Sequence, residues 1–130
     1  MGMPEKYNDI KIFLPDFFKT LQDPEVVKEG AKGQNLTVQY AITDDPGLSH
    51  WMKIADGKIT TGKGEASGPS ATIKLGTTEM KTMFTDPQQA QMLFMSGQIQ
   101  VEGDMSVLMQ MGQMVSFRKV LGKMGFTKDA

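Results

Sequence analysis

Apolar residues recur along the chain with two different periods, which divide it into predicted helices and strands. Near the N-terminus they follow one another at steps of three and four, the spacing of one helix face, at Ile10, Phe13, Leu14, Phe17 and Leu21. This spacing predicts an amphipathic helix, which Pro15 would either kink or restart. Asp23-Pro24-Glu25 then predicts a short helical turn.

From Leu36 onward the period changes to two, which is typical of strands with one buried face. The alternation predicts four strands, over residues 36–42, 48–54, 58–65 and 71–75. Turn residues separate them, and Asp56-Gly57 is the strongest short turn signal of the chain. The first three strands should therefore form an antiparallel meander. Because every strand keeps a polar side, one face of the sheet should meet water and helices should cover the other.

The C-terminal half returns to helical spacing, with one further strand. Thr77 or Thr78 is expected to cap one helix, and Asp86-Pro87 to begin the next, which Gly97 ends. Residues 98–102 alternate again and predict a fifth strand. Gly103-Asp104 then begins a helix that should run to about Met124, a length of about 30 Å.

This last predicted helix is apolar around much of its circumference. Its main stripe consists of Val107, Leu108, Met111, Met114, Val115 and Leu121. A second apolar set falls beside that stripe, at Met105, Met109, Phe117, Val120 and Met124. A helix of this kind needs a cover beyond the sheet, so we expect another helix, a ligand or a second subunit to pack on it.

Methionine is the unusual feature of the composition. The chain has 12 methionines against 8 leucines, and nine of them lie between Met80 and Met124. A flexible, polarisable side chain suits a surface that accepts ligands of varying shape, although methionine also fills gaps in ordinary cores. The composition therefore leaves both interpretations open.

Charge and cysteine content exclude several classes of protein. With 14 basic and 15 acidic residues the net charge is −1, and no basic cluster marks a nucleic-acid partner. No apolar run approaches the roughly 20 residues of a membrane span, so we expect no stable membrane insertion. The chain has no cysteine, and its N-terminus lacks the order of a secretory signal. Because the C-terminal residues Lys128-Asp129-Ala130 also differ from a peroxisomal signal, we expect a cytoplasmic protein.

The order of the predicted elements, together with one motif, resembles the sterol carrier protein 2 family across most of the chain. The motif is a glycine, a short alternating strand, a Gly-Asp pair and a closing helix, and here it is residues 97–104 followed by 105–124. Two weaker similarities lie upstream: Trp51 followed by Asp56-Gly57, and the strand Ala71-Thr72-Ile73-Lys74-Leu75.

The resemblance implies an α+β fold, with residues 1–130 as one lipid-carrier domain. Its five-stranded sheet would have helices over one face and an apolar tunnel between the layers. The implied function is non-catalytic carriage of a fatty acid, fatty acyl-CoA, sterol-like molecule or phospholipid, with no cofactor and no metal. We expect the middle helices, the fifth strand and the last helix to line the cavity through Met80, Met83, Phe84, Leu93, Phe94, Ile99, Val101, Leu108, Met111 and Val115.

Two other functions compete with lipid carriage. A small cavity enzyme would need a buried carboxylate and a tyrosine or protonated acid, but only Tyr7 and Tyr40 are available and no acid lies at an inward strand position. The single histidine, His50, lacks the partners of a triad or a metal site, and we interpret it as structural or as part of a pocket rim. A protein-interaction or dimerisation module using the same methionine-rich helices remains open, and with it a homodimer.

Overall fold

A mixed five-stranded sheet with the strand order β3-β2-β1-β4-β5 forms the centre of the fold. The computed structural model describes residues 4–126, except for the side chains of Phe84, Thr85, Pro87, Leu108 and Met109. The strands are β1 (Asn35–Ile42), β2 (His50–Ala55), β3 (Lys58–Lys63), β4 (Ala71–Leu75) and β5 (Gln100–Gly103). β1 pairs parallel with β4, and the other neighbours are antiparallel, including the predicted meander of the first three strands.

The five strands overlap the segments that the period of two predicts. β2 begins at His50 and not at Leu48, which lies in a short helical turn, and β3 ends at Lys63 and not at Glu65. Val38 is paired with Met52 across β1 and β2, and both side chains are fully buried on the inner face. Trp51 points to the outer face, where its indole covers Gly62 of the neighbouring strand. β5 begins two residues later than predicted, because the amides of Gln98 and Ile99 both donate to the carbonyl of Leu93 instead of to β4.

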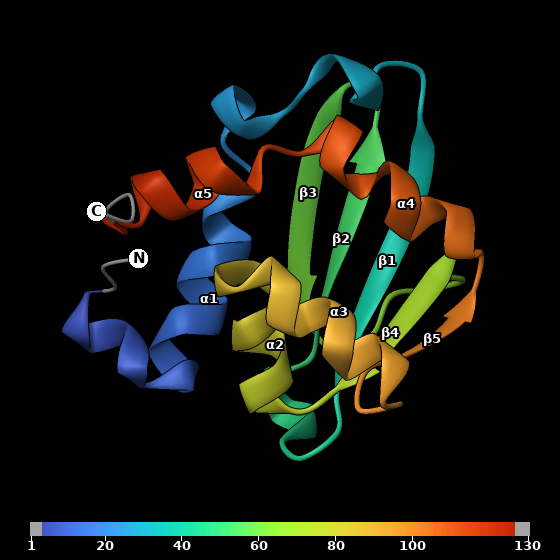
Figure 1. Ribbon diagram of the computed structural model, residues 1–130. Helices are drawn as coiled ribbons and strands as arrows, with labels where there is room; N and C mark the ends of the chain where they lie inside the picture. The colour runs from blue at the N-terminus through green and yellow to red at the C-terminus, as the bar shows by residue number, and fades with distance from the viewer. Residues whose placement is uncertain (1–3, 127–130) are drawn as a thin grey trace.

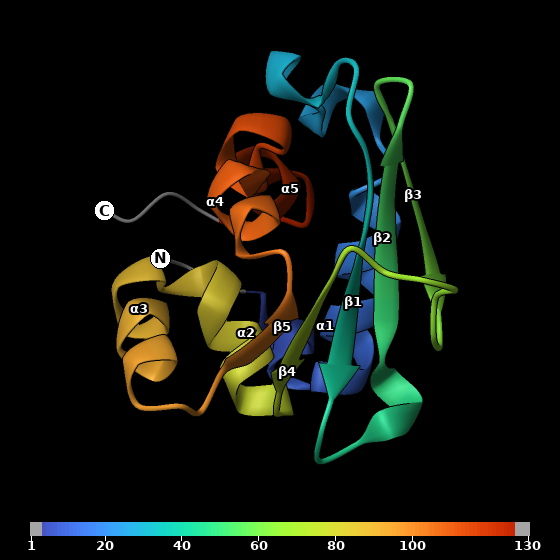
Figure 2. The ribbon, with the colours of Figure 1, turned by 90° about the vertical axis from the view of Figure 1, so that its right-hand side faces the viewer.

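Within residues 4–126, five α-helices accompany the sheet (Figures 1 and 2). They are α1 (Ile10–Thr20), α2 (Thr77–Thr85), α3 (Pro87–Met95), α4 (Met105–Met114) and α5 (Phe117–Lys123). α2, α3 and α4 lie on one side of the sheet, and α1 lies toward its β3 edge, where the Thr61 hydroxyl donates to the carbonyl of Phe18. The expected layer of helices over one face is therefore present.

An aromatic cluster packs α1 against the sheet and α5. Phe13, Phe17 and Phe18 are at most 1% exposed, and the ring of Phe17 stacks on that of Phe117 from α5. This buried face holds α1 together as a single helix through Pro15, whose exposed position loses only one backbone hydrogen bond. The expectation that the helix restarts at Pro15 is therefore wrong.

The helix predicted to run from Asp104 to Met124 is two helices, so that prediction is also wrong. Val115 has extended backbone angles and forms a β-bridge with Val27 from the segment after α1. On either side of the bridge, the amide of Lys28 donates to Met114 and the amide of Ser116 donates to Val26, at 2.9 and 2.8 Å. The Ser116 hydroxyl then caps α5 by accepting from the amide of Lys119.

The break explains how the second apolar set of this region is covered. α5 takes a new direction toward α1 (Figure 1), which buries Val120 and Met124 and half-buries Phe117. Another part of the same chain therefore covers these three residues, whereas Met105 on α4 is exposed.

The capping residue was predicted wrongly for α2 and correctly for α3. Gly76, not Thr77 or Thr78, is the residue that precedes α2, and its amide donates to the side chain of Glu79. Asp86 caps α3 as predicted, by accepting from the amide of Gln89. The proximity of Asp44, which accepts from the amide of Thr77 at 2.9 Å, moves the start of α2 and is not visible in the local sequence.

A buried glutamine fixes the connection from β3 to β4 across the outer face of the sheet. The side-chain amide of Gln39 donates to the carbonyls of His50 and Gly64, and its oxygen accepts from the amide of Ala66 at 2.6 Å. The side chain is 5% exposed, so these three bonds exclude water as an alternative partner.

We expect Gln39→Leu to lower the free energy of unfolding by about 1–3 kcal/mol, because it leaves the half-buried carbonyl of Gly64 and amide of Ala66 without their partner. Urea denaturation measures this loss. Gln100→Leu is the matched control, since Gln100 is an exposed glutamine on a strand and its replacement should change stability by less than about 0.5 kcal/mol. Equal losses in both variants would contradict the role given to Gln39.

His50 is a structural histidine on the opposite face of the same strand pair. Its ring lies parallel to that of Phe18, with centroids 4.4 Å apart, and its Nδ1 lies 2.7 Å from the carbonyl oxygen of Leu48. Burial lowers the pKa of His50 below its ordinary value of 6.5, and the nearby Lys63 acts in the same direction.

The folded chain therefore resists the proton that the unfolded chain takes up at His50. The neutral His50 side chain should not reduce the free energy of unfolding above pH 6.5, its ordinary pKa. Below that pH the free energy of unfolding should decrease as the unfolded chain binds the proton. We expect the Tm of the wild type to fall between about pH 7 and about pH 5.5 more than that of His50→Gln, which cannot titrate. Parallel Tm curves for the two proteins would show that His50 does not contribute.

Candidate apolar binding site

The predicted lining residues whose side chains are described belong to one apolar cluster in the core and at its border. They lie on α2, α3 and α4, on β5, and at the breaks that flank these elements. Figures 1 and 2 show α3 and α4 on the same side of the sheet, with α3 beside β4 and β5 and α4 crossing from β5 toward α5. Val101 of β5 is paired with Ile73 of β4, so the strand period places both on the face that the helices cover.

Burial divides the ten predicted residues into three groups. Met80, Ile99, Met111 and Val115 are at most 6% exposed and belong to the hydrophobic core. Met83, Leu93, Phe94 and Val101 are half-buried and pack against that core. The side chains of Phe84 and Leu108 lie outside the part of the chain that the structure describes.

The geometry supports an apolar surface that extends from the core toward solvent. Its inner part is closed by Met80 and Met111, and its outer part consists of the four half-buried side chains. Met92 and Met95 of α3 extend beyond it and are 62% and 82% exposed. The arrangement is suited to an apolar ligand, while the tunnel itself stays a prediction.

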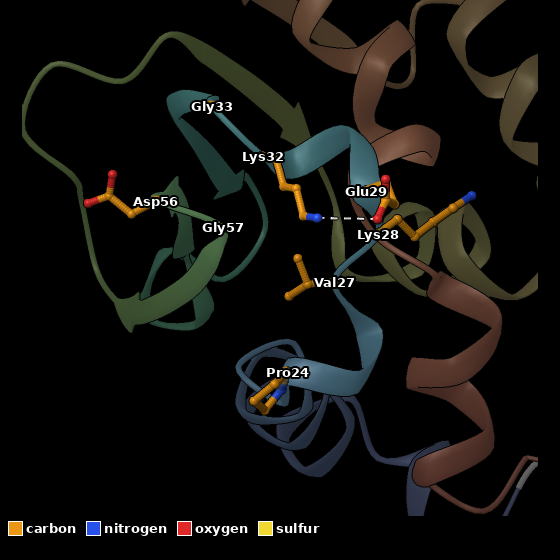
Figure 3. Close-up of a pocket in the computed structure, with 8 residues that line it drawn as sticks. All are labelled: Pro24, Val27, Lys28, Glu29, Lys32, Gly33, Asp56 and Gly57. Atoms are coloured by element: carbon orange, nitrogen blue, oxygen red, sulfur yellow. Dashed lines mark hydrogen bonds and ion pairs between the residues drawn. The ribbon is translucent and has the colours of Figure 1, made fainter.

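A separate groove, which the sequence analysis missed, lies between the segment after α1 and the β2–β3 turn (Figure 3). It has a volume of about 630 Å³ and is lined by Pro24, Val27, Lys28, Glu29, Lys32, Gly33, Asp56 and Gly57. The turn residues Gly33 and Asp56-Gly57 were the visible signal, but nothing in the sequence indicates that the two turns face each other.

The charges of this groove are largely used by the protein itself. The Lys32 ammonium pairs with Glu29 at 3.3 Å, as Figure 3 shows, and the Lys28 ammonium donates to the carbonyl of Gly112 on α4 at 2.7 Å. These contacts connect the segment after α1 to α4, and the eight predicted lining residues whose side chains are described all lie outside the groove.

Ion pairs hold α5 beside the same segment. Lys123 lies 3.1 Å from Asp23 and 2.8 Å from Glu25. The hydrogen bonds to these carboxylates raise the pKa of Lys123, and bonds from the amide of Glu25 and from Lys123 lower the pKa of Asp23. The carboxylates are therefore engaged in fixing α5.

Residues 4–126 contain no helix that is long and apolar enough to cross a membrane.

Comparison with known proteins identifies the family. The model of the SCP-2 sterol transfer family matches residues 16–116, which include all five strands and the helices α2, α3 and α4. No curated protein sequence matches the chain.

Solved structures share the fold at low sequence identity. The apo sterol carrier protein 2 from Yarrowia lipolytica is 18% identical with a TM-score of 0.51, over 85% of this chain and 89% of its own. The sterol carrier protein 2 like 2 from Aedes aegypti is 13% identical with a TM-score of 0.55, over 79% and 96%.

An enzyme contains the same fold as one part of a longer chain. The inverting sec-alkylsulfatase Pisa1 from Pseudomonas sp. is 20% identical with a TM-score of 0.61 over 78% of this chain, which spans only 16% of that enzyme. The sheet order, the helical layer and the family match agree, and the chain belongs to the SCP-2 sterol transfer family.

Proposed function

We propose that residues 1–130 act as one carrier domain that binds an apolar lipid between the sheet and α2, α3 and α4. The observation that carries the proposal is the half-buried set Met83, Leu93, Phe94 and Val101, which continues the core toward solvent in a member of a sterol transfer family. The ligand classes are fatty acid, fatty acyl-CoA, sterol-like molecule and phospholipid. All ten predicted residues form the proposed lining.

The side chains of the lining favour a site whose affinity increases with the length of the ligand's acyl chain and that accepts ligands of different shape. Each methylene transferred from water contributes about 0.8 kcal/mol, so a long acyl chain offsets the entropic cost of its binding. Met80, Met83 and Met111 have three rotatable bonds each, which lets the lining follow ligands of different outline. A pocket of branched side chains would discriminate more strongly.

We further propose that the domain catalyses nothing itself and acts in the cytoplasm. His50 is engaged with Leu48 and Phe18 in the core, and the described residues contain no group of three or more His, Asp or Glu side chains that could hold a metal ion. The sulfatase activity in the name of the structural relative belongs to a chain of which this one spans 16%.

The direct test is to identify what the purified protein carries. Native mass spectrometry and organic extraction should reveal a co-purifying lipid in the monomer. A protein without lipid that forms a stable dimer, and that takes up no fatty acid when titrated, would support the interaction module instead.

Substitutions in the lining test which side chains meet the ligand. We expect Phe94→Asp to weaken binding of a fluorescent fatty acid at least tenfold, because an unpaired charge would lie on the apolar surface. Gln91→Asp is the control, since Gln91 is exposed on the same helix and should leave binding unchanged. If Phe94→Asp remains folded in a thermal melt and binds as well as the wild type, α3 does not form part of the site.

Met111 tests the adaptability of the lining. We expect Met111→Asp to abolish binding, with a loss of stability because the side chain is 6% exposed. Met111→Leu nearly conserves volume and should cost less than about 1.5 kcal/mol of stability while narrowing the range of ligands accepted. Titration with fatty acids of several lengths measures that range, and an unchanged range in the leucine variant would count against methionine adaptability.

A further inference from the structure

Solvent-exposed methionine is a feature of this fold that ligand carriage does not explain. Four large apolar side chains are exposed among the described residues, namely Ile12, Met92, Met95 and Met105. Three of these four are methionines, whereas every leucine and phenylalanine whose side chain is described is buried or half-buried. Methionine therefore occupies exposed positions from which the other large apolar residues are largely withdrawn.

The packing properties of methionine have little effect at these positions. A flexible side chain helps to fill gaps in a core, but Met92, Met95 and Met105 are 62%, 82% and 56% exposed to solvent. The property by which methionine still differs from leucine there is its thioether sulfur, which accepts an oxygen atom from oxidants. The chain has no cysteine, so thioethers are its only sulfur groups.

Burial divides the described methionines both by their access to an oxidant and by the consequence of oxidation. Met52, Met80 and Met114 are at most 1% exposed, and a sulfoxide in their place would be a polar group without a partner in the core. A sulfoxide on one of the three exposed methionines would instead be hydrated by solvent. The exposed thioethers can therefore be oxidised with the smallest loss of stability.

Two of the exposed methionines lie beside the proposed ligand site. Met92 and Met95 flank Leu93 and Phe94 on α3, and these two half-buried residues pack against the core. Met83 on α2 is also half-buried in the proposed lining, which leaves its sulfur partly open to solvent. Because Met92 and Met95 are the more exposed, they should react with an oxidant before Met83 does.

We propose that Met92, Met95 and Met105 intercept oxidants and thereby protect the methionines of the core and of the proposed lining. The oxidant class is a two-electron oxidant such as hypochlorous acid. The sulfur lone pair attacks the chlorine, water then displaces chloride, and the net products are a sulfoxide, chloride and one proton. Interception does not depend on the proposed carrier function, whereas the protection of ligand binding rests on it.

The exposed sulfoxides can also be reduced back to thioethers. Methionine sulfoxide reductases transfer two electrons from thiols to a sulfoxide, which releases its oxygen as water. Such an enzyme has to enclose the oxidised side chain, and the high exposure of Met92, Met95 and Met105 permits this in the folded protein. Interception by these residues is therefore renewable.

Limited oxidation of the full chain tests the proposal. The purified protein receives about one to three equivalents of hypochlorous acid, and peptide mapping by mass spectrometry measures the sulfoxide at each methionine. We expect at least about tenfold more sulfoxide on the three exposed methionines than on Met52, Met80 and Met114, because burial shields the latter. Equal oxidation of the two groups would overturn the proposal.

The triple variant Met92→Leu/Met95→Leu/Met105→Leu removes the exposed sulfur and nearly conserves side-chain volume. Without oxidant it should match the wild type in Tm and in affinity for a fluorescent fatty acid, since the three residues lie outside the proposed lining. With hypochlorous acid it should lose half of its binding, and half of its folded fraction, at about one third of the dose that the wild type needs. Ile12→Leu is the matched control, because it changes an exposed apolar residue without removing sulfur.

The outcomes separate interception from carriage. If the wild type takes up fatty acid but the triple variant resists oxidation equally well, interception is wrong and carriage stands. If the exposed methionines protect the Tm and the core methionines but no fatty acid is taken up, interception stands and carriage fails. Treatment of the oxidised wild type with methionine sulfoxide reductases and a thiol should restore the three thioethers, and persistence of their sulfoxides would overturn the renewal.

Discussion

The backbone contact between the segment after α1 and the break between α4 and α5 determines the arrangement of the helical layer. Two hydrogen bonds and the bridge of Val27 with Val115 replace bonds that an uninterrupted helix would have made within itself. Lys28 and Gly30 strengthen the contact, the lysine by binding the carbonyl of Gly112 and the glycine by leaving space for Gln113. A side chain at Gly30 would collide with that backbone, so the approach requires glycine.

This contact produces two regions of core with different character. Toward β3, α1 and α5 meet in a cluster of aromatic rings whose geometry is specific, with Phe18 placed between Tyr40 and His50. Toward β5, α2, α3 and α4 contribute methionine and aliphatic side chains, among them Met80 and Met111. The aromatic region has one specific packing. In the region of α2, α3 and α4, the flexible methionine side chains let the packing change at the lowest cost in free energy. The ligand site that we propose lies on the side of these three helices.

Methionine occupies different kinds of position in this protein. Met52 and Met114 are at most 1% exposed and fill the core as other apolar residues would. Met92, Met95 and Met105 are 62%, 82% and 56% exposed. The composition alone left the two interpretations level. The structure confirms that several methionines fill the core, and an adaptable ligand lining stays a proposal.

The sequence by itself determined the local elements and the face that each one buries. Alternation placed all five strands and separated Trp51 from Met52, because strand geometry puts neighbouring side chains on opposite faces. Asp86 and Asp104 were recognisable as caps because capping depends on residues within one helical turn. The tertiary structure decided where long-range contacts compete with local preference. The β-bridge with Val27 interrupts the predicted last helix at Val115. The hydrogen bond from Thr77 to Asp44 helps to set the start of α2, and the groove beside Lys32 forms from two turns that are far apart in sequence. Each of these depends on a partner at least 23 residues away, and periodicity holds no information about such a partner.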